Sequence, residues 1–202
     1  MFSGTLRDFI ELDIGEKFNH LTEVWHSKKP VEILPSKELP ALLERLHYFN
    51  FSLWHEEDEA RRTDTTDSLI AQVKRNIDKF NQNRNDTIQR IDEVLYHLLA
   101  SNHYDLKGGE LNSETPGSMI DRNSIMSLKV YHMNEIAIDP KETEELRSQC
   151  ATKVLKLKEQ QKDLESCVKA LLVNIAKGQR HFKVYFQFKM YNDPNLNPAL
   201  KK

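Results

Sequence analysis

The sequence predicts an all-α protein, a helical bundle of about five helices followed by a short C-terminal extended segment. The 202 residues include only 6 Gly and 7 Pro, and 30% of them are charged, which favours long helices over turn-rich sheets. Apolar residues also recur at spacings of three and four along most of the chain, as on one face of a helix. The length fits one domain over residues 1–202, with a helical core over about 5–178 and an extended segment and tail over 181–202.

The first part of the chain is divided by prolines. Residues 5–26 are expected to form one helix or two short ones, which end before Pro30 and Pro35. A second helix is expected from its capping residue Ser36 to about Arg62, and a third over about 67–101. Both helices carry an apolar stripe, which in the second consists of Leu39, Leu42, Leu46, Phe49 and Leu53.

The second part begins with a clear helix start. Thr115 is a capping residue before Pro116, and the helix that follows, to about Ile136, is apolar nearly all round, which predicts a place in the middle of the bundle. A fifth helix is expected from Asp139-Pro140 to about Lys177. Its apolar seam fits an internal core and a partner helix equally well. The seam of this fifth helix consists of Leu146, Cys150, Val154, Leu157, Leu164, Val168, Leu171 and Ile175.

Residues 181–190 alternate apolar and polar side chains, which predicts an extended segment packed on the bundle.

Charge and composition exclude several classes of function. The net charge of −2 divides into −8 over residues 1–140 and +6 over 141–202, but no aromatic residues interleave the basic helix, so nucleic-acid binding is disfavoured. No run approaches the roughly 20 apolar residues of a membrane span. The N-terminus has no signal-peptide pattern, so a cytoplasmic location is expected. Cys150 and Cys167 should lie on one helix, too far apart to bridge, as core thiols.

Charged and polar residues interrupt the apolar stripes of two helices. On a helical projection Arg84 falls in the middle of the third helix's apolar arc, with Asn81 at its edge. Glu57 and Asn50 fall within the arc of the second helix, and Arg61 lies one turn beyond Glu57. Burying an unpaired charge costs several kcal/mol. Two alternatives therefore stay open: a buried ion-pair network of Glu57 with Arg61 or Arg84, and a functional cleft.

Carboxylates near the end of the second helix are candidate metal ligands or acid/base groups. The string WHEEDEARR (54–62) offers oxygen ligands of the kind that suit Mg²⁺ or Mn²⁺. Consecutive residues point all round a helix, so only two or three can share one site. Glu57 and Asp58 are the candidate catalytic and metal-binding pair, and a solvated face explains the other acidic residues of the string.

The helix start at Pro116 is a second candidate site. Gly117 and Ser118 in its first turn offer free backbone N–H groups to a phosphate, although any capped helix start shows such residues. Asp121 and His132 fall on one side of this helix, and a lone histidine there is more often a satisfied core residue than a base. No nucleophile elbow, P-loop, dinucleotide fingerprint or zinc pattern is present in the sequence.

Five strings along the chain form an ordered set: LWHEEDEAR (53–61), KRNIDKFNQNRNDTIQRID (74–92), ETPGSMIDR (114–122), LKVYHM (128–133) and FKVYFQFKMYNDPNLNP (182–198). Together these strings resemble the family catalogued as domain of unknown function 4254. Asn123 departs from the pattern, where an apolar residue is expected. The resemblance implies a bacterial helical protein without an assigned activity, often encoded beside glycosyltransferases and other genes of lipopolysaccharide or surface-polysaccharide synthesis. The polar residues within these strings are His55, Glu57, Asp58, Arg61, Arg75, Asp78, Asn81, Arg84, Asn85, Asp92, Glu114, Asp121 and Arg122.

Three hypotheses follow, and whether the protein is an enzyme stays open among them. The leading one is an accessory protein or enzyme of envelope-glycan assembly whose polar cleft takes a phosphorylated or nucleotide-linked sugar. The second is a metal-dependent all-α phosphohydrolase with Glu57 and Asp58 near Mg²⁺ or Mn²⁺. The third is a non-catalytic interaction module that docks on a glycosyltransferase or self-associates. The expected ligand-binding residues are Arg61, Asn81, Arg84, Asn85, Glu114, Gly117, Asp121 and Arg122.

Overall fold

The computed structural model describes residues 6–186, 188 and 195–201. Helices carry most of this part of the chain, which confirms the all-α class. Two-residue strands β1 and β2 pair in parallel, Glu110 opposite Arg180 and Leu111 opposite His181. The elements are α1 (Leu6–Glu11), α2 (Ile14–Ser27), α3 (Leu39–Glu59), α4 (Asp67–Ser101), β1 (Glu110–Leu111), α5 (Pro116–Ile138), α6 (Glu144–Ala176), β2 (Arg180–His181) and a 3₁₀ turn η1 (Pro198–Leu200).

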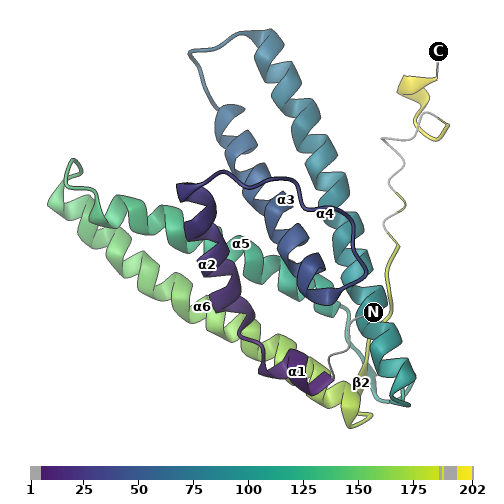
Figure 1. The fold of residues 1–202 in the computed structure, drawn as a ribbon. Helices are drawn as coiled ribbons and strands as arrows, with labels where there is room; N and C mark the ends of the chain where they lie inside the picture. Colours follow the sequence, from purple (N-terminus) through teal and green to yellow (C-terminus); the bar gives the residue numbers. More distant parts are fainter. Residues whose placement is uncertain (1–5, 187, 189–194, 202) are drawn as a thin grey trace.

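The helices form two hairpins that cross. Figure 1 shows α3 and α4 as one antiparallel pair and α5 and α6 as the other, with α2 lying across both. Helix α5 contacts α2, α3, α4 and α6, so the prediction of a central helix is confirmed. Among the helices that the structure describes, none combines the length and apolar character needed to cross a bilayer.

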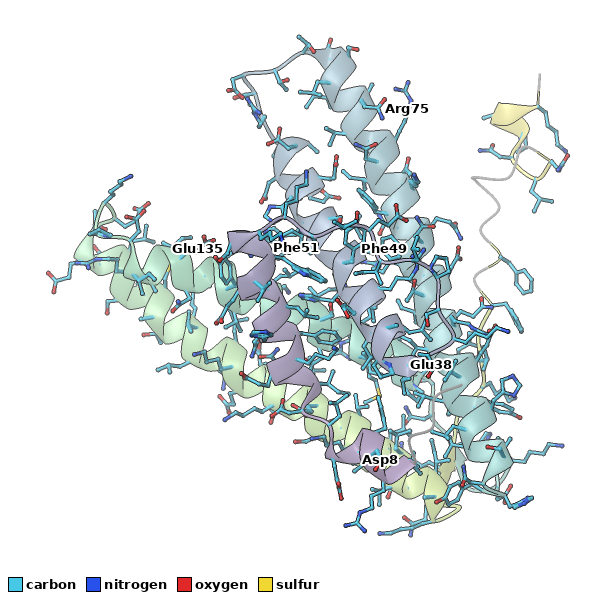
Figure 2. All side chains as sticks on the ribbon, viewed as in Figure 1. Asp8, Glu38, Phe49, Phe51, Arg75 and Glu135 are labelled. Carbon is cyan, nitrogen blue, oxygen red and sulfur yellow. The ribbon has the colours of Figure 1, made fainter. Side chains whose placement is uncertain are left out.

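The main core lies where the hairpins cross. Large side chains from α2, α3, α4, α5 and α6 are fully buried there, among them Phe18, Leu43, Leu46, Ile91, Leu95, Ile120 and Leu172. A smaller cluster of Trp25, Phe51 and Leu128 joins α2, α3 and α5. Figure 2 places Phe51 on the side of α3 that faces α2 and Phe49 on the side that faces α4.

Two helix starts differ from the prediction. Glu38, and not Ser36, holds the N-cap position of α3, while the Ser36 hydroxyl accepts a hydrogen bond from the Glu38 N–H within the preceding turn. Helix α6 begins at the cap Thr143, whose hydroxyl oxygen accepts from the Leu146 N–H at 3.2 Å. Asp139 instead ends α5 in an extended conformation. Ser and Asp favour both caps and turns, so only the local hydrogen bonds decide between them.

The seam of α6 faces the interior. Its members Cys150, Val154, Val168, Leu171 and Ile175 are buried, and α6 packs along α5. Leu157 and Leu164 are half-buried, and Leu146 is exposed. The covered seam removes the main support for docking a partner helix on this face. Cys167 is exposed, so its prediction as a core thiol was wrong.

Among the described residues of the C-terminal extended segment, Phe182 and Val184 at its start pack on the bundle, whereas Phe186 and Phe188 do not. Phe182 is buried and Val184 packs against the main core. Phe186 and Phe188 are 58% and 84% exposed, so the alternating pattern does not bury them. The remaining predicted positions of this segment, residues 187, 189 and 190, lie outside the described residues.

Candidate functional site

A polar cleft of about 360 Å³ lies between α3, α4 and α5. Its volume falls in the range of pockets that hold small ligands. Helix α3 supplies its wall from residues spaced three and four apart, which share one face of the helix. The sequence predicted five of its lining residues as site residues. The full lining is Asn50, Leu53, Trp54, Glu57, Asp58, Arg61, Asn81, Arg84, Ile125 and Leu128.

Arg84 is the cation on the inner wall of this cleft. Its side chain is 25% exposed, and its Nε lies 4.0 Å from a carboxylate oxygen of Asp121 on α5. That separation gives charge compensation without a hydrogen bond. The Nε is buried and has no hydrogen-bond partner among the described residues. A guanidinium offers five donors in a planar fork, so Arg84 keeps capacity to bind an anionic ligand.

A chain of buried hydrogen bonds forms the back of the cleft. The Asn50 side-chain amide donates to Asp121 at 2.9 Å and to the Ser124 hydroxyl at 3.0 Å. The ring of His47 bridges Ser124, at 2.9 Å, and Thr22 on α2, at 3.0 Å. Burial above all, with nearby cationic groups, lowers the pKa of His47 to about 3, so the ring is neutral. Asn50 therefore interrupts its apolar stripe to join this network, which links α2, α3 and α5.

Burial also acts on the carboxyl group that faces Arg84. It raises the pKa of Asp121, while the Arg84 charge and the Asn50 hydrogen bond oppose this rise. Arg84 is thus the charge that helps to keep Asp121 ionised in a buried position. Removing either partner leaves the other charge without compensation.

Glu57 and Arg61 pair with each other at the rim. The distance between the carboxylate and guanidinium is 3.0 Å, with 45% and 69% of the two side chains exposed. The predicted pairing of these residues therefore exists, but it lies on the surface and not in a buried network. An exposed pair four residues apart contributes only about 0.3–0.5 kcal/mol, so a ligand can displace it at little cost.

Four predicted site residues do not join the cleft. Glu114 and Arg122 form an ion pair with each other at 2.8 Å, and neither lines the cleft. Asn85 is half-buried on α4 and is also outside the lining. Gly117 is buried, and its N–H donates to a carboxylate oxygen of Asp92 at 2.6 Å. Asp92 of the same chain thus takes one of the backbone N–H groups that the sequence offered to a phosphate, which favours the alternative of an ordinary capped helix start.

A second cavity, of about 450 Å³, lies on the opposite flank of α3. It is lined by aromatic rings and by two histidines, together with Lys29 and two carboxylates. Because the α3 residues that line it are offset by two positions from those that line the cleft, the two spaces face away from each other. The lining is Trp25, His26, Lys29, Pro30, Tyr48, Phe51, Ser52, His55, Glu56, Glu59 and Phe80.

Three histidines meet beside this cavity, from α2, α3 and α5. They are His26, His55 and His132, and each offers one ring nitrogen within 4.8 Å of the others. Burial lowers the pKa of His55 and of His132, with a smaller effect from His26. In the part of the chain that the structure describes, no other group of three His, Cys, Asp or Glu side chains is close enough to share a metal ion. Glu57 and Asp58 therefore do not gather with a third such ligand.

Sequence reasoning did not find this cluster. His55 entered only as one member of an acidic string, His132 was expected to be a satisfied core residue, and His26 was not singled out. The three residues come from separate helices, so no spacing within one helix connects them. The contact exists only after the hairpins cross.

The fold and the cleft define a helical protein that holds a ligand-sized polar site between its two hairpins. Residues 40–184 match the model of the family described as protein of unknown function, DUF4254. The chain belongs to this family, and the resemblance inferred from its sequence strings is confirmed. No curated protein and no solved structure matches the chain. The matched region contains every residue that lines the cleft, while α2 with His26 lies before it.

Proposed function

We propose that this protein binds a phosphorylated or nucleotide-linked sugar in the cleft between α3, α4 and α5. It would act in the bacterial cytoplasm as an accessory protein or enzyme of lipopolysaccharide or surface-polysaccharide assembly. The observation that carries the binding proposal is Arg84, a cation on the cleft wall whose side chain is 25% exposed and whose Nε lies 4.0 Å from the Asp121 carboxylate, too far for a hydrogen bond. The sugar class comes from the gene neighbourhood that the family resemblance implies.

Charges along the cleft favour a phosphate accompanied by a divalent cation. Two acidic residues, Glu57 and Asp58, and two basic ones, Arg61 and Arg84, line the space, so its charge is balanced. A free phosphate would meet both arginines and both carboxylates. A Mg²⁺ or Mn²⁺ ion bound to the phosphate removes the repulsion, because the carboxylates then face the metal and the arginines face phosphate oxygens.

The rest of the lining suits the sugar. Leu53, Trp54, Ile125 and Leu128 offer apolar surface to its C–H groups. Asn81 and Asn50 stand among the polar groups of the cleft that a sugar hydroxyl can meet. If the protein is an enzyme, Glu57 or Asp58 would serve as the acid/base group, because both carboxylates belong to the wall that the ligand contacts.

A thermal-shift screen tests the proposal. The wild type, Arg84→Ala and Arg84→Lys are melted with sugar phosphates, nucleotides and sugar nucleotides, each with and without Mg²⁺ or Mn²⁺. A ligand at about 100 times its Kd stabilises the fold by about 2.7 kcal/mol. For a chain of this size that is about 5–10 °C in Tm. We expect the shift to be lost in Arg84→Ala and partly kept in Arg84→Lys, which retains the charge.

Arg75→Ala is the matched control. Arg75 lies on the same helix, exposed, and Figure 2 shows its side chain pointing away from the bundle near the turn between α3 and α4. Its variant should keep the full ligand shift. The proposal fails if no compound stabilises the wild type while Arg84→Ala only melts earlier, because Arg84 is then a structural partner of Asp121 and nothing more.

A further inference from the structure

The three rings of the histidine cluster are spaced as around one ion. Their centroids are 5.1 Å apart for His26 and His55, 4.8 Å for His26 and His132, and 5.6 Å for His55 and His132. One nitrogen of each ring lies within 4.8 Å of the others. Nitrogens bound to one tetrahedral Zn²⁺, with Zn–N of about 2.0–2.1 Å, are about 3.3 Å apart. Each imidazole therefore needs to move by less than about 1 Å to bind the same ion.

Hydrogen bonds fix the state of two of these rings. The Nδ1 of His26 lies 2.7 Å from the Thr22 backbone carbonyl, which only accepts, so this nitrogen carries the proton. The Nδ1 of His132 lies 2.8 Å from a carboxylate oxygen of Glu135, and it donates in the same way. In the neutral rings each Nε2 then holds a lone pair. Histidine ligands of metals commonly have this arrangement, with the distal N–H held by a carbonyl or carboxylate.

Those two Nε2 atoms are both buried and lack a hydrogen-bond partner among the described residues. The rings that carry these two atoms, His26 and His132, have centroids 4.8 Å apart, with the His55 imidazole beside them. A buried polar atom without a partner is unfavourable, and a bound cation would satisfy both lone pairs at once.

Neighbouring aromatic rings hold the imidazoles in their planes. Tyr131 stacks on His26 with centroids 3.9 Å apart, and Trp54 stacks on His132 at 4.8 Å. His26 and His55 also line the 450 Å³ cavity, so a fourth ligand can approach from that side.

We propose that His26, His55 and His132 bind one Zn²⁺ ion, with a fourth coordination position open to this cavity. Imidazole nitrogens suit Zn²⁺, whereas the Mg²⁺ or Mn²⁺ considered for the cleft prefers oxygen ligands. Three protein ligands with one open position is the arrangement of catalytic zinc, in which bound water or substrate takes the fourth place. The zinc proposal does not rest on sugar binding in the cleft, although Trp54 lines the cleft and also stacks on His132, and its test does not use a sugar ligand.

Metal titration of the untagged full chain tests this proposal. Metal-free protein is titrated with Zn²⁺ in competition with a chromogenic chelator, and with Co²⁺ to record its visible absorption. We expect one Zn²⁺ per chain and the intense absorption of four-coordinate Co²⁺. His55→Ala should weaken binding by at least about 100-fold, and Glu135→Gln, which acts through His132, by about 10–100-fold.

His20→Ala serves as the control, since His20 is an exposed histidine on the same helix as His26. It should bind Zn²⁺ like the wild type. Circular dichroism shows whether each variant folds, and His55 is the preferred position because its substitution leaves the hydrogen bonds of His26 to Thr22 and of His132 to Glu135 in place. The proposal is overturned if the wild type binds no Zn²⁺, or if His55→Ala binds it as tightly as His20→Ala does. Binding that survives in His55→Ala but is lost in Glu57→Gln would also overturn it and assign the ion to the cleft.

Discussion

Asp92 makes the stability of this protein depend on pH in a direction opposite to that of an ordinary paired carboxylate. Burial raises its pKa from 3.8 to about 6, against the hydrogen bonds from Thr115 and Gly117. The folded protein therefore holds this proton more tightly than the unfolded chain does. It follows that the contribution of Asp92 to the free energy of unfolding grows as pH falls through about 6 and levels off below about 3.8.

Asp92→Asn isolates this contribution. The amide is uncharged at every pH, and its oxygen can still accept from the Gly117 N–H. Relative to the variant, the wild type should gain about 1.4 kcal/mol between about pH 7.5 and about pH 5, as calculated from the two pKa values. For a chain of this size that corresponds to about 3–6 °C in the difference between the two Tm values.

Urea denaturation followed by circular dichroism measures the difference at each pH. Comparing two proteins cancels the titration of all other carboxylates, which they share. Asp86→Asn is the control, because Asp86 is exposed on the same helix, and its difference from the wild type should stay within about 0.5 kcal/mol throughout. The argument is refuted if the difference in the free energy of unfolding between the wild type and Asp92→Asn does not change with pH, or if the wild type becomes less stable than the variant as pH falls. The two donors would then hold Asp92 ionised.

Two further predictions concern buried side chains. His47→Phe should lower the free energy of unfolding by about 2–3 kcal/mol, since the hydroxyls of Thr22 and Ser124 lose their ring partner. In NMR titrations the wild-type ring should stay neutral down to about pH 4. A titration midpoint near pH 6 would contradict its burial. Phe182→Ala should cost about 3–5 kcal/mol in urea denaturation. Phe186→Ala, at a 58% exposed position, should cost under about 0.5 kcal/mol, and equal losses would show that the segment does not pack as described.

The fold was predictable because its causes are local. Stripes of apolar residues at helical spacing gave the helices, and the pair Thr115-Pro116 marked the start of α5 correctly. The predicted helix starts were wrong where two nearby residues can both cap a helix. Asp139 and Thr143 are both good caps, and only the Leu146 N–H, bound to Thr143, decides between them.

The cleft was partly predictable for the same reason. Arg84 stood out because a charge in the middle of an apolar arc needs a partner, and Asp121 supplies it. The partner of Gly117 could not be foreseen, because Asp92 reaches it from another helix. Such contacts depend on how the hairpins cross, which periodicity within one helix does not encode.

Helix α3 is a shared wall, because one of its flanks lines the cleft and the other lines the 450 Å³ cavity. Trp54 makes the sharing direct, since it lines the cleft and its ring stacks on His132 of the histidine cluster. A substitution that changes how α3 packs would therefore alter both spaces, and a variant designed against one of them has to be checked at the other.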